Sequence, residues 1–127
     1  GDLVGHERGW MSRKQLETYA DDDTSLGYIL ETLKNQQMHQ GTLIIITADH
    51  GGYDTTHGTD MAEDMTIPWI ASGPGIQPKQ LTTPVHTMDT AATAAFALGL
   101  DSPDDWNGVP VYEAFGLSVE RQSVQCE

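Results

Sequence analysis

The hydrophobic positions of this chain predict strands in two places. Thr42–Thr47 is a short run of β-branched and apolar residues that contains no proline and no charge. A continuous run of this length is typical of a strand buried on both faces, as in a parallel α/β sheet. Thr66–Ala71 has the composition of a second strand, and Pro68 near its start favours an edge position or the entry to the strand.

The segment before the first strand has helical spacing. Ser12 with Gln15 three positions later is a capping-box pattern, so we expect a helix to begin at Ser12. The helix is expected to end near Met38. A short connection then leads into the strand, as expected of a layered α/β sheet. Its apolar face would consist of Leu16, Tyr19, Leu26, Ile29, Leu30 and Leu33.

A second helix is predicted after the second strand. The alanine-rich segment Thr90–Leu98 is preceded by two candidate caps, Thr87 and Asp89, and is followed by Gly99. The residues between the strand and this helix have turn chemistry and then the composition of a linker.

The composition narrows the classes of function. The 127 residues suffice for one modest domain, and 19 acidic against 6 basic residues give a formal net charge of −13. A chain this acidic lacks the basic surface that binding to a nucleic acid or an anionic membrane requires. It can still bind a small phosphate, because bound metal ions reverse the local field. No stretch approaches the roughly 18 apolar residues of a membrane span.

The single cysteine and the first residues bear on the origin of the chain. Because Cys126 is the one cysteine of the sequence, the chain can form neither an intrachain disulfide nor a cysteine-based zinc site. The chain begins GDLVGHERG, with neither an initiator methionine nor a signal-peptide pattern. We therefore expect it to be a fragment of a longer protein.

Candidate metal ligands follow the first strand. Asp49 and His50 stand side by side where that strand should end, and two glycines then let the backbone turn tightly. In open α/β sheets, sites collect at the carboxyl ends of strands. Asp2 and His6 are separated by three residues, a spacing that brings both side chains to one cation on a helical turn or a compact loop. A surface or capping role is the alternative for this second pair.

His57, in the loop before the second strand, brings the candidate ligands to five. Carboxylate and imidazole together suit zinc, manganese or iron better than calcium. A catalytic zinc typically takes about three protein ligands, so these side chains would nearly fill two sites. Two cations about 4 Å apart clamp the attacking and leaving oxygens of an in-line displacement at phosphorus. The ligand set therefore favours phosphoryl transfer.

The order of these motifs resembles the alkaline phosphatase superfamily, and within it the type I phosphodiesterase and nucleotide pyrophosphatase branch. The resemblance covers residues 1–115 and corresponds to the C-terminal half of that domain. The matching motifs are D-x-x-x-H at Asp2–His6, G-W-M-S at Gly9–Ser12, D-x-x-L-G at Asp23–Gly27, T-A-D-H-G-G at Thr47–Gly52, H-G at His57–Gly58, I-P-W-I-x-x-G-P-G-I at Ile67–Ile76 and D-T-A-A-T at Asp89–Thr93.

The resemblance implies a fold and an activity. The fold would be a three-layer α/β/α sandwich of the alkaline phosphatase-like type, with residues 1–116 as the C-terminal portion of its catalytic domain, carrying part of the sheet, and residues 117–127 as a tail. The activity would be metal-dependent hydrolysis of a small phosphate ester, with no nucleic-acid polymer as partner. The resemblance to the family also suggests a periplasmic or extracellular location.

The resemblance also implies how the ligands are shared. Asp2, His6 and His57 would hold one divalent cation, and Asp49 and His50 the other, with zinc favoured for both. In the family the second cation also takes an earlier aspartate and a serine or threonine nucleophile. Neither is identifiable in this chain, so no catalytic residue is assigned here and the nucleophile is expected upstream.

Several alternatives stay open. Another branch of the superfamily, such as a sulfatase or a cofactor-independent phosphoglycerate mutase, would carry the same ligands. If the chain is complete as given, a non-catalytic metal-binding module is the alternative from a different class. His86 is a rival third ligand, whereas His39 is expected to satisfy carbonyls at a helix end. Thr55 and Thr56 follow the ligand pair instead of opening a helix, so we reject them as nucleophiles.

Two further sets of side chains receive a structural interpretation. Asp54, Asp60 and Asp64 are taken as loop carboxylates, one of which could support His57 from outside the ligand shell. The tryptophans are taken as packing residues in preference to platforms for a substrate. They are Trp10, Trp69 and Trp106.

Overall fold

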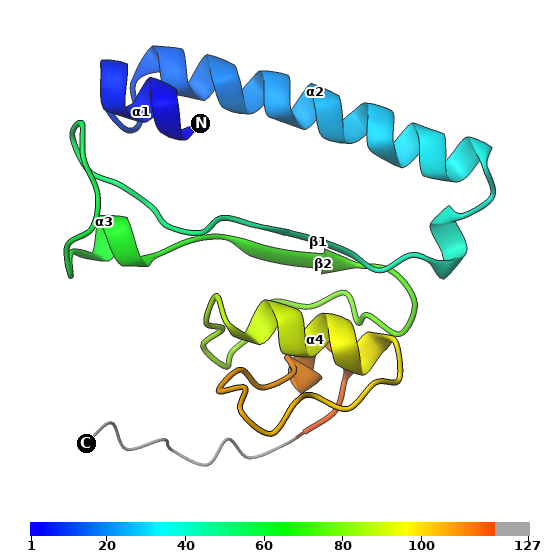
Figure 1. Cartoon of the computed structure of the whole chain (residues 1–127). Coiled ribbons are helices and arrows are strands. Elements are labelled where there is room, and N and C mark those ends of the chain that lie inside the picture. The colour runs from blue at the N-terminus through cyan, green and yellow to red at the C-terminus, as the bar shows by residue number, and fades with distance from the viewer. Residues whose placement is uncertain (119–127) are drawn as a thin grey trace. The chain divides into compact units, whose positions relative to one another are not determined.

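The computed structural model describes residues 1–118, which form two compact units (Figure 1). The first unit comprises Gly1–Thr42 and Ile46–Ile70. The second comprises Leu43–Ile45 and the described residues from Ala71 onward.

The predicted division into residues 1–116 and a tail, 117–127, stays a prediction. Residues 119–127, and with them Cys126, lie outside the part of the chain that the structure describes. Among residues 1–118, none of the helices has both the length and the apolar character needed to cross a bilayer.

Both predicted strands are present, but they form a different kind of sheet. β1 (Ile44–Thr47) pairs with β2 (Trp69–Ser72), and the two strands run antiparallel (Figure 1). The interpretation of the first strand as part of a parallel sheet, buried on both faces, is therefore wrong for the described residues. The connection between the strands contains a single helical turn, α3 (Ala62–Met65), instead of a crossover helix, so the chain reverses direction. The last two residues of β1 are exposed, and the sheet has two strands in the part of the chain that the structure describes.

This sheet with its helices is compatible with a fragment of an alkaline phosphatase-like fold. The three-layer sandwich stays a prediction. The helical turn α3 was not predicted, because its residues belong to the loop expected before the second strand.

The first predicted helix is confirmed, and a shorter helix precedes it. α1 (Asp2–Arg8) lies beside the start of α2 (Arg13–Asn35) in the first unit (Figure 1). The cap is as predicted, since Ser12 Oγ accepts a hydrogen bond of 3.2 Å from Gln15 N. The Gln15 side chain is buried and departs from the usual box, because its Oε1 accepts from Met11 N at 2.7 Å instead of from the cap residue.

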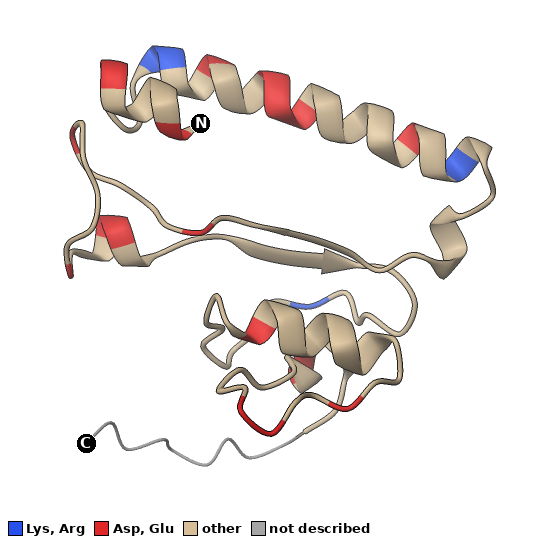
Figure 2. Cartoon of the chain, viewed as in Figure 1, with Lys and Arg blue, Asp and Glu red and all other residues tan. Residues whose placement is uncertain are grey.

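The charges of α2 face solvent. Figure 2 shows acidic residues along this helix and through the loops, with few basic residues among them. Arg13 and Lys14 both pair with Glu17, at 3.0 and 2.8 Å, in exposed contacts of the kind that contribute little to stability. Beyond α2 a short 3₁₀ helix, η1 (His39–Gly41), leads into β1.

The second unit is built around α4 (Asp89–Ala97), close to the helix predicted at Thr90–Leu98. Asp89 is fully buried at its first turn, and its carboxylate accepts from His86 N at 2.8 Å and Val109 N at 2.9 Å. The predicted cap is therefore wrong, because Met88 is the cap residue and no side chain caps the helix, and Asp89 instead ties the preceding turn and the distant Val109 to its first turn.

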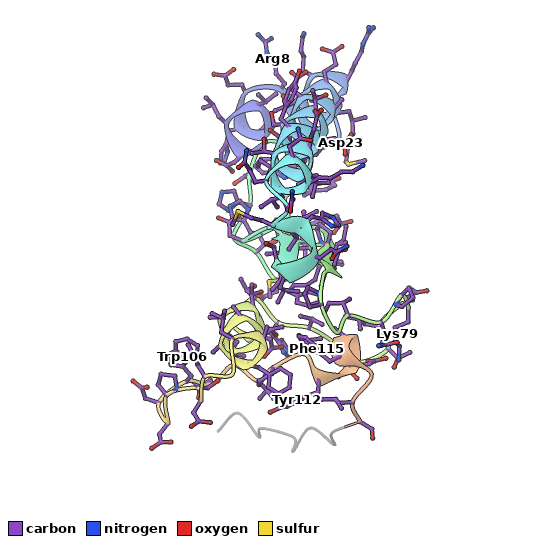
Figure 3. All side chains as sticks on the ribbon, turned by 90° about the vertical axis from the view of Figure 1, so that its right-hand side faces the viewer. Arg8, Asp23, Lys79, Trp106, Tyr112 and Phe115 are labelled. Carbon is purple, nitrogen blue, oxygen red and sulfur yellow. The ribbon has the colours of Figure 1, made fainter. Side chains whose placement is uncertain are left out.

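Aromatic packing attaches η2 (Tyr112–Phe115), a 3₁₀ helix, to α4. The Phe96 ring meets Tyr112 and Phe115 edge to face, with centroids 5.0 and 5.1 Å apart, and Figure 3 labels the last two side chains. The Thr93 hydroxyl adds a buried link, because it donates to Asp89 O at 2.6 Å and accepts from Val111 N at 2.9 Å.

Glu113 in η2 holds the linker that precedes α4. Its carboxylate accepts hydrogen bonds from Thr82 N, Thr82 Oγ1 and Thr83 N, at 2.9 to 3.1 Å, and lies 2.9 Å from Lys79 Nζ (Figure 3 labels Lys79). The bond from Lys79, followed by those from Thr83 and Thr82, holds the pKa of Glu113 far below its usual value.

We predict that Glu113 makes the stability of the protein depend on pH. Because its pKa is lower in the folded than in the unfolded state, its charge stabilises the fold above the unfolded pKa, and this contribution is lost as the pH falls from about 5 downwards. Glu113→Gln should lower the free energy of unfolding at pH 7 and make it less dependent on pH in the acid range. Chemical denaturation of the full-length protein at several pH values measures both, with Glu31→Gln on the exposed face of α2 as the control. Equal pH dependence in the two variants would contradict the prediction.

Candidate metal centre

A carboxylate oxygen of Asp2 lies among three imidazoles. Asp2 Oδ1 is 3.5 Å from His6 Nε2, 3.9 Å from His50 Nε2 and 3.7 Å from His57 Nε2. The rings of His50 and His57 are stacked, with centroids 3.7 Å apart, and His6 is tilted against His57 at 5.0 Å. Four of the five predicted ligands thus converge on one point of the first unit.

These side chains reach the centre from three segments. Asp2 and His6 are one turn apart on α1, which settles the D-x-x-x-H spacing as helical. His50 follows the end of β1, and His57 comes from the loop that leads to α3. All three segments belong to the first unit.

Backbone carbonyls orient two of the imidazoles. His6 Nδ1 lies 2.9 Å from Thr55 O, and His50 Nδ1 lies 2.7 Å from Gly51 O. A carbonyl oxygen only accepts, so each Nδ1 carries a proton and each Nε2 is left with its lone pair when the ring is neutral. This is the usual arrangement of a histidine that binds metal through Nε2.

The surroundings of His50 favour positive charge. The hydrogen bond to Gly51 O, together with the charges of Asp49 and Asp2, raises the pKa of His50, while partial burial opposes the rise. A divalent cation at the same place would meet the same attraction.

Asp49 stands at the open side of the cluster. Its side chain is 87% exposed, its Oδ1 accepts from His50 N at 3.0 Å, and its Oδ2 lies 3.7 Å from His50 Nε2. Asp49 is therefore next to the other ligands, but water reaches it freely.

The donor set of the centre suits a transition metal. Asp2, His50 and His57 each offer one ligand atom, and these atoms all lie within 4.8 Å of one another. With His6 beside them, the set contains imidazole nitrogen and carboxylate oxygen, which zinc, manganese and iron accept. This grouping puts His50 with Asp2 and His57, whereas the resemblance assigned it to the second cation. The division of the ligands between two cations stays a prediction.

Trp10 supports the imidazoles, a role that the sequence analysis did not identify. Its indole meets His6 edge to face at 5.1 Å and His57 at 5.8 Å. A side chain on Gly52 would collide with this indole, and one on Gly5 would come within 2.8 Å of it. Trp10 follows His6 by four residues, and this spacing is the signal that could have revealed the contact with His6.

The two glycines after His50 serve a purpose other than the predicted tight turn. Neither is among the described glycines with positive φ. Gly51 N donates to Asp64 O at 2.7 Å and Gly52 N to Glu63 O at 2.9 Å, and a Cβ on Gly51 would collide with Glu63 O. Glycine is needed here because the backbone passes so close to α3.

The remaining candidates are not members of this cluster, or they act through their backbone. His86 belongs to the second unit, where its Nδ1 is 3.5 Å from Asp89 Oδ2, and His39 opens η1. Thr55 contributes its carbonyl to His6, and Thr56 forms an isolated bridge with Tyr53. Nothing in this geometry tests the upstream nucleophile.

Comparison with known proteins gives both a family match and individual relatives. The family model described as type I phosphodiesterase / nucleotide pyrophosphatase matches residues 1–108. The chain is 35% identical over 115 residues to a phosphopentomutase of Clostridium perfringens, covering 87% of this chain and 28% of the relative. A phosphopentomutase of Clostridium botulinum is 33% identical over 117 residues, covering 88% and 28%.

An organism of another genus provides a similar match. A phosphopentomutase of Methylorubrum extorquens is 40% identical over 103 residues, covering 78% of this chain and 24% of the relative. The chain thus spans less than a third of the length of these curated relatives. No solved structure matches it. Because the family match extends over most of its length, this chain belongs to the type I phosphodiesterase / nucleotide pyrophosphatase family of the alkaline phosphatase superfamily, as its motifs indicated.

Proposed function

We propose that the protein carrying this chain is a metal-dependent phosphoryl-transfer enzyme that acts on a small phosphate ester. The observation that carries the proposal is the position of Asp2 Oδ1, within 3.9 Å of the Nε2 atoms of three histidines. Imidazole nitrogens and a carboxylate oxygen placed this close together can serve as ligands of one cation. The family of the chain supports phosphoryl transfer as the reaction.

The residues of this chain prepare the centre for its cations. Thr55 O and Gly51 O fix the Nδ1 protons of His6 and His50, so that both Nε2 atoms face the centre. Asp2 contributes negative charge, and Trp10 restrains the rings of His6 and His57. Bound divalent cations would supply positive charge that stabilises the negative charge on the phosphate oxygens, and they would orient the attacking and leaving oxygens for in-line displacement.

We further propose that the centre is shared with residues outside this chain. Asp49 and His50 lie side by side at the exposed edge of the cluster, as two ligands of a second cation would. The remaining ligand and the serine or threonine nucleophile would come from upstream, as in the family.

Hydrolysis and transfer within one substrate are both open to such a centre. Hydrolysis of a phosphate ester is what the family resemblance implies. Transfer within the substrate is the second candidate, and the observation that favours it is that the curated relatives are phosphopentomutases.

The first prediction concerns metal content. Purified full-length protein should contain two equivalents of a divalent transition metal, and Asp49→Ala should lower kcat/KM by more than about 100-fold, since even outer-shell partners of a ligand contribute 10–100-fold. The fold should hardly change, because the Asp49 side chain is 87% exposed. Elemental analysis, steady-state kinetics and thermal unfolding measure the three effects, with the exposed Asp60→Ala as control. A protein free of transition metal would count against the whole proposal.

The second prediction concerns the products. If the protein is a mutase, a pentose phosphate should be isomerised with its phosphate retained, and nitrophenyl phosphate mono- and diesters should turn over slowly. Phosphorus NMR of the reaction mixture separates the isomers from free phosphate. Release of inorganic phosphate or nitrophenol as the main reaction would establish the hydrolase instead.

The third prediction concerns Trp10. Gly52→Ala puts a methyl group onto the indole, and overpacking of this kind costs about 1–3 kcal/mol. We expect the variant to be less stable and to bind metal more weakly, and Trp10→Phe in the same chain should restore part of both. Gly27→Ala is the control, because no heavy atom lies within 4 Å of the added Cβ and alanine in a helix is favoured by about 0.5–1 kcal/mol. Equal metal affinity in the wild type and Gly52→Ala would show that Trp10 does not support the centre.

A further inference from the structure

Asp64 is a buried carboxylate close to the candidate metal centre, although it is not one of the predicted ligands. Only 4% of the residue is exposed. Its Oδ2 accepts from Thr59 N at 2.8 Å and from Thr59 Oγ1 at 2.7 Å. Its Oδ1 is buried and has no hydrogen-bond partner among the described residues. The carboxylate is therefore largely shielded from water.

The backbone of Asp64 holds the segment that follows His50. Gly51 N donates to Asp64 O at 2.7 Å, and the neighbouring bond from Gly52 N to Glu63 O, at 2.9 Å, secures the same stretch of α3. His50 directly precedes Gly51 and Gly52, whose amides are both hydrogen-bonded to α3. The Nδ1 of His50 itself lies against Gly51 O.

The side chain of Asp64 holds the segment that follows His57. Thr59 stands two positions after that histidine, and both its amide and its hydroxyl donate to the carboxylate. The Thr59 hydroxyl oxygen also accepts a hydrogen bond from Met61 N at 3.2 Å, so the proton of this hydroxyl is left to point toward Asp64. One residue therefore anchors both of the segments that present the stacked imidazoles of His50 and His57.

The charge of Asp64 acts in the same direction as its hydrogen bonds. Bonds from Thr59 hold the pKa of Asp64 below its usual value, so the carboxylate is ionised at neutral pH, and the charge of His57 contributes to the shift. A fixed negative charge in a poorly hydrated position attracts a cation at the neighbouring centre more strongly than an exposed one does.

We propose that Asp64 is the positioning residue of the metal centre, which holds His50 and His57 in register and strengthens cation binding by its buried charge without contacting the cation. This inference rests on the proposed function. It differs from a purely structural role, in which Asp64 would stabilise the loop but leave the affinity of the folded protein for metal unchanged.

The test separates the hydrogen bonds from the charge in the full-length protein. Asp64→Asn is isosteric and keeps an oxygen for the donors of Thr59, but it removes the charge. Thr59→Val keeps the charge and removes the hydroxyl, whereas Thr59→Ser restores the hydroxyl. Asp60→Asn removes a neighbouring exposed carboxylate and serves as the matched control.

The readouts are the affinity for Co²⁺ or Mn²⁺ by calorimetry and the visible absorption spectrum of bound Co²⁺, which reports ligand geometry. We expect Asp64→Asn and Thr59→Val each to weaken binding by about 10–100-fold, and Thr59→Val to change the spectrum. Thr59→Ser and Asp60→Asn should stay within about threefold of the wild type, well below the effect of losing an outer-shell partner.

Two results would overturn the inference in distinguishable ways. Metal binding by the wild type with unchanged affinity and spectrum in Asp64→Asn and Thr59→Val would refute the role of Asp64 and leave the proposed function standing. Failure of the wild type itself to bind a transition metal would refute both. If Asp64→Asn does not fold, the pair Thr59→Val and Thr59→Ser decides the question alone.

Discussion

The first unit depends on the convergence of three imidazoles on one oxygen of Asp2. The contacts of 3.5 to 3.9 Å require that α1, the end of β1 and the loop at His57 all reach the same place. Each approach has a local cause. A helical turn sets the distance from Asp2 to His6, and two backbone carbonyls turn the rings of His6 and His50 so that Nε2 faces inward. Removing any of these supports would free the imidazoles to turn away from the centre.

Buried polar side chains, more than apolar ones, connect the described segments. The buried hydrophobic residues of the described chain are Ala92, Val111 and Ala114, and all of them are small or medium in size. The buried polar residues are Gln15, Asp64, Asp89 and Thr93, and each bonds to the backbone of another segment or of a neighbouring turn. Such bonds specify geometry closely, because a buried donor or acceptor that loses its partner costs about 1–3 kcal/mol. The arrangement of the site is therefore specified by hydrogen bonds that a hydrophobicity pattern does not reveal.

The sequence predicted the elements with strong local signals. The cap at Ser12, the helix near Thr90 and the strand at Thr42–Thr47 each have a pattern confined to a few residues. The structure contains all three, with the strand beginning at Ile44. The convergence of Asp2, His6, His50 and His57 was likewise predictable, because the order of the motifs matched a family. The direction of the strand pair was not, since it depends on a connection whose single helical turn has no periodic signature. The contact of Trp10 with His57 was missed for a related reason, because it joins segments that are not neighbours in sequence. Asp64 was among three carboxylates of which one was expected to support His57, but local patterns did not distinguish it from Asp54 and Asp60.

The ligands come from widely separated parts of the chain, and this has a thermodynamic consequence. The hydrogen bond between His6 and Thr55 already joins residues 49 positions apart. A cation held between α1 and the loop at His57 would join the same two distant segments. Because it would bind the folded unit and not the unfolded chain, it would stabilise the folded state by mass action. Its contribution would rise with the logarithm of free cation concentration above the dissociation constant. Folding of the first unit would then respond to the supply of metal, while the second unit, which carries none of the five candidate ligands, would have no such dependence of its own.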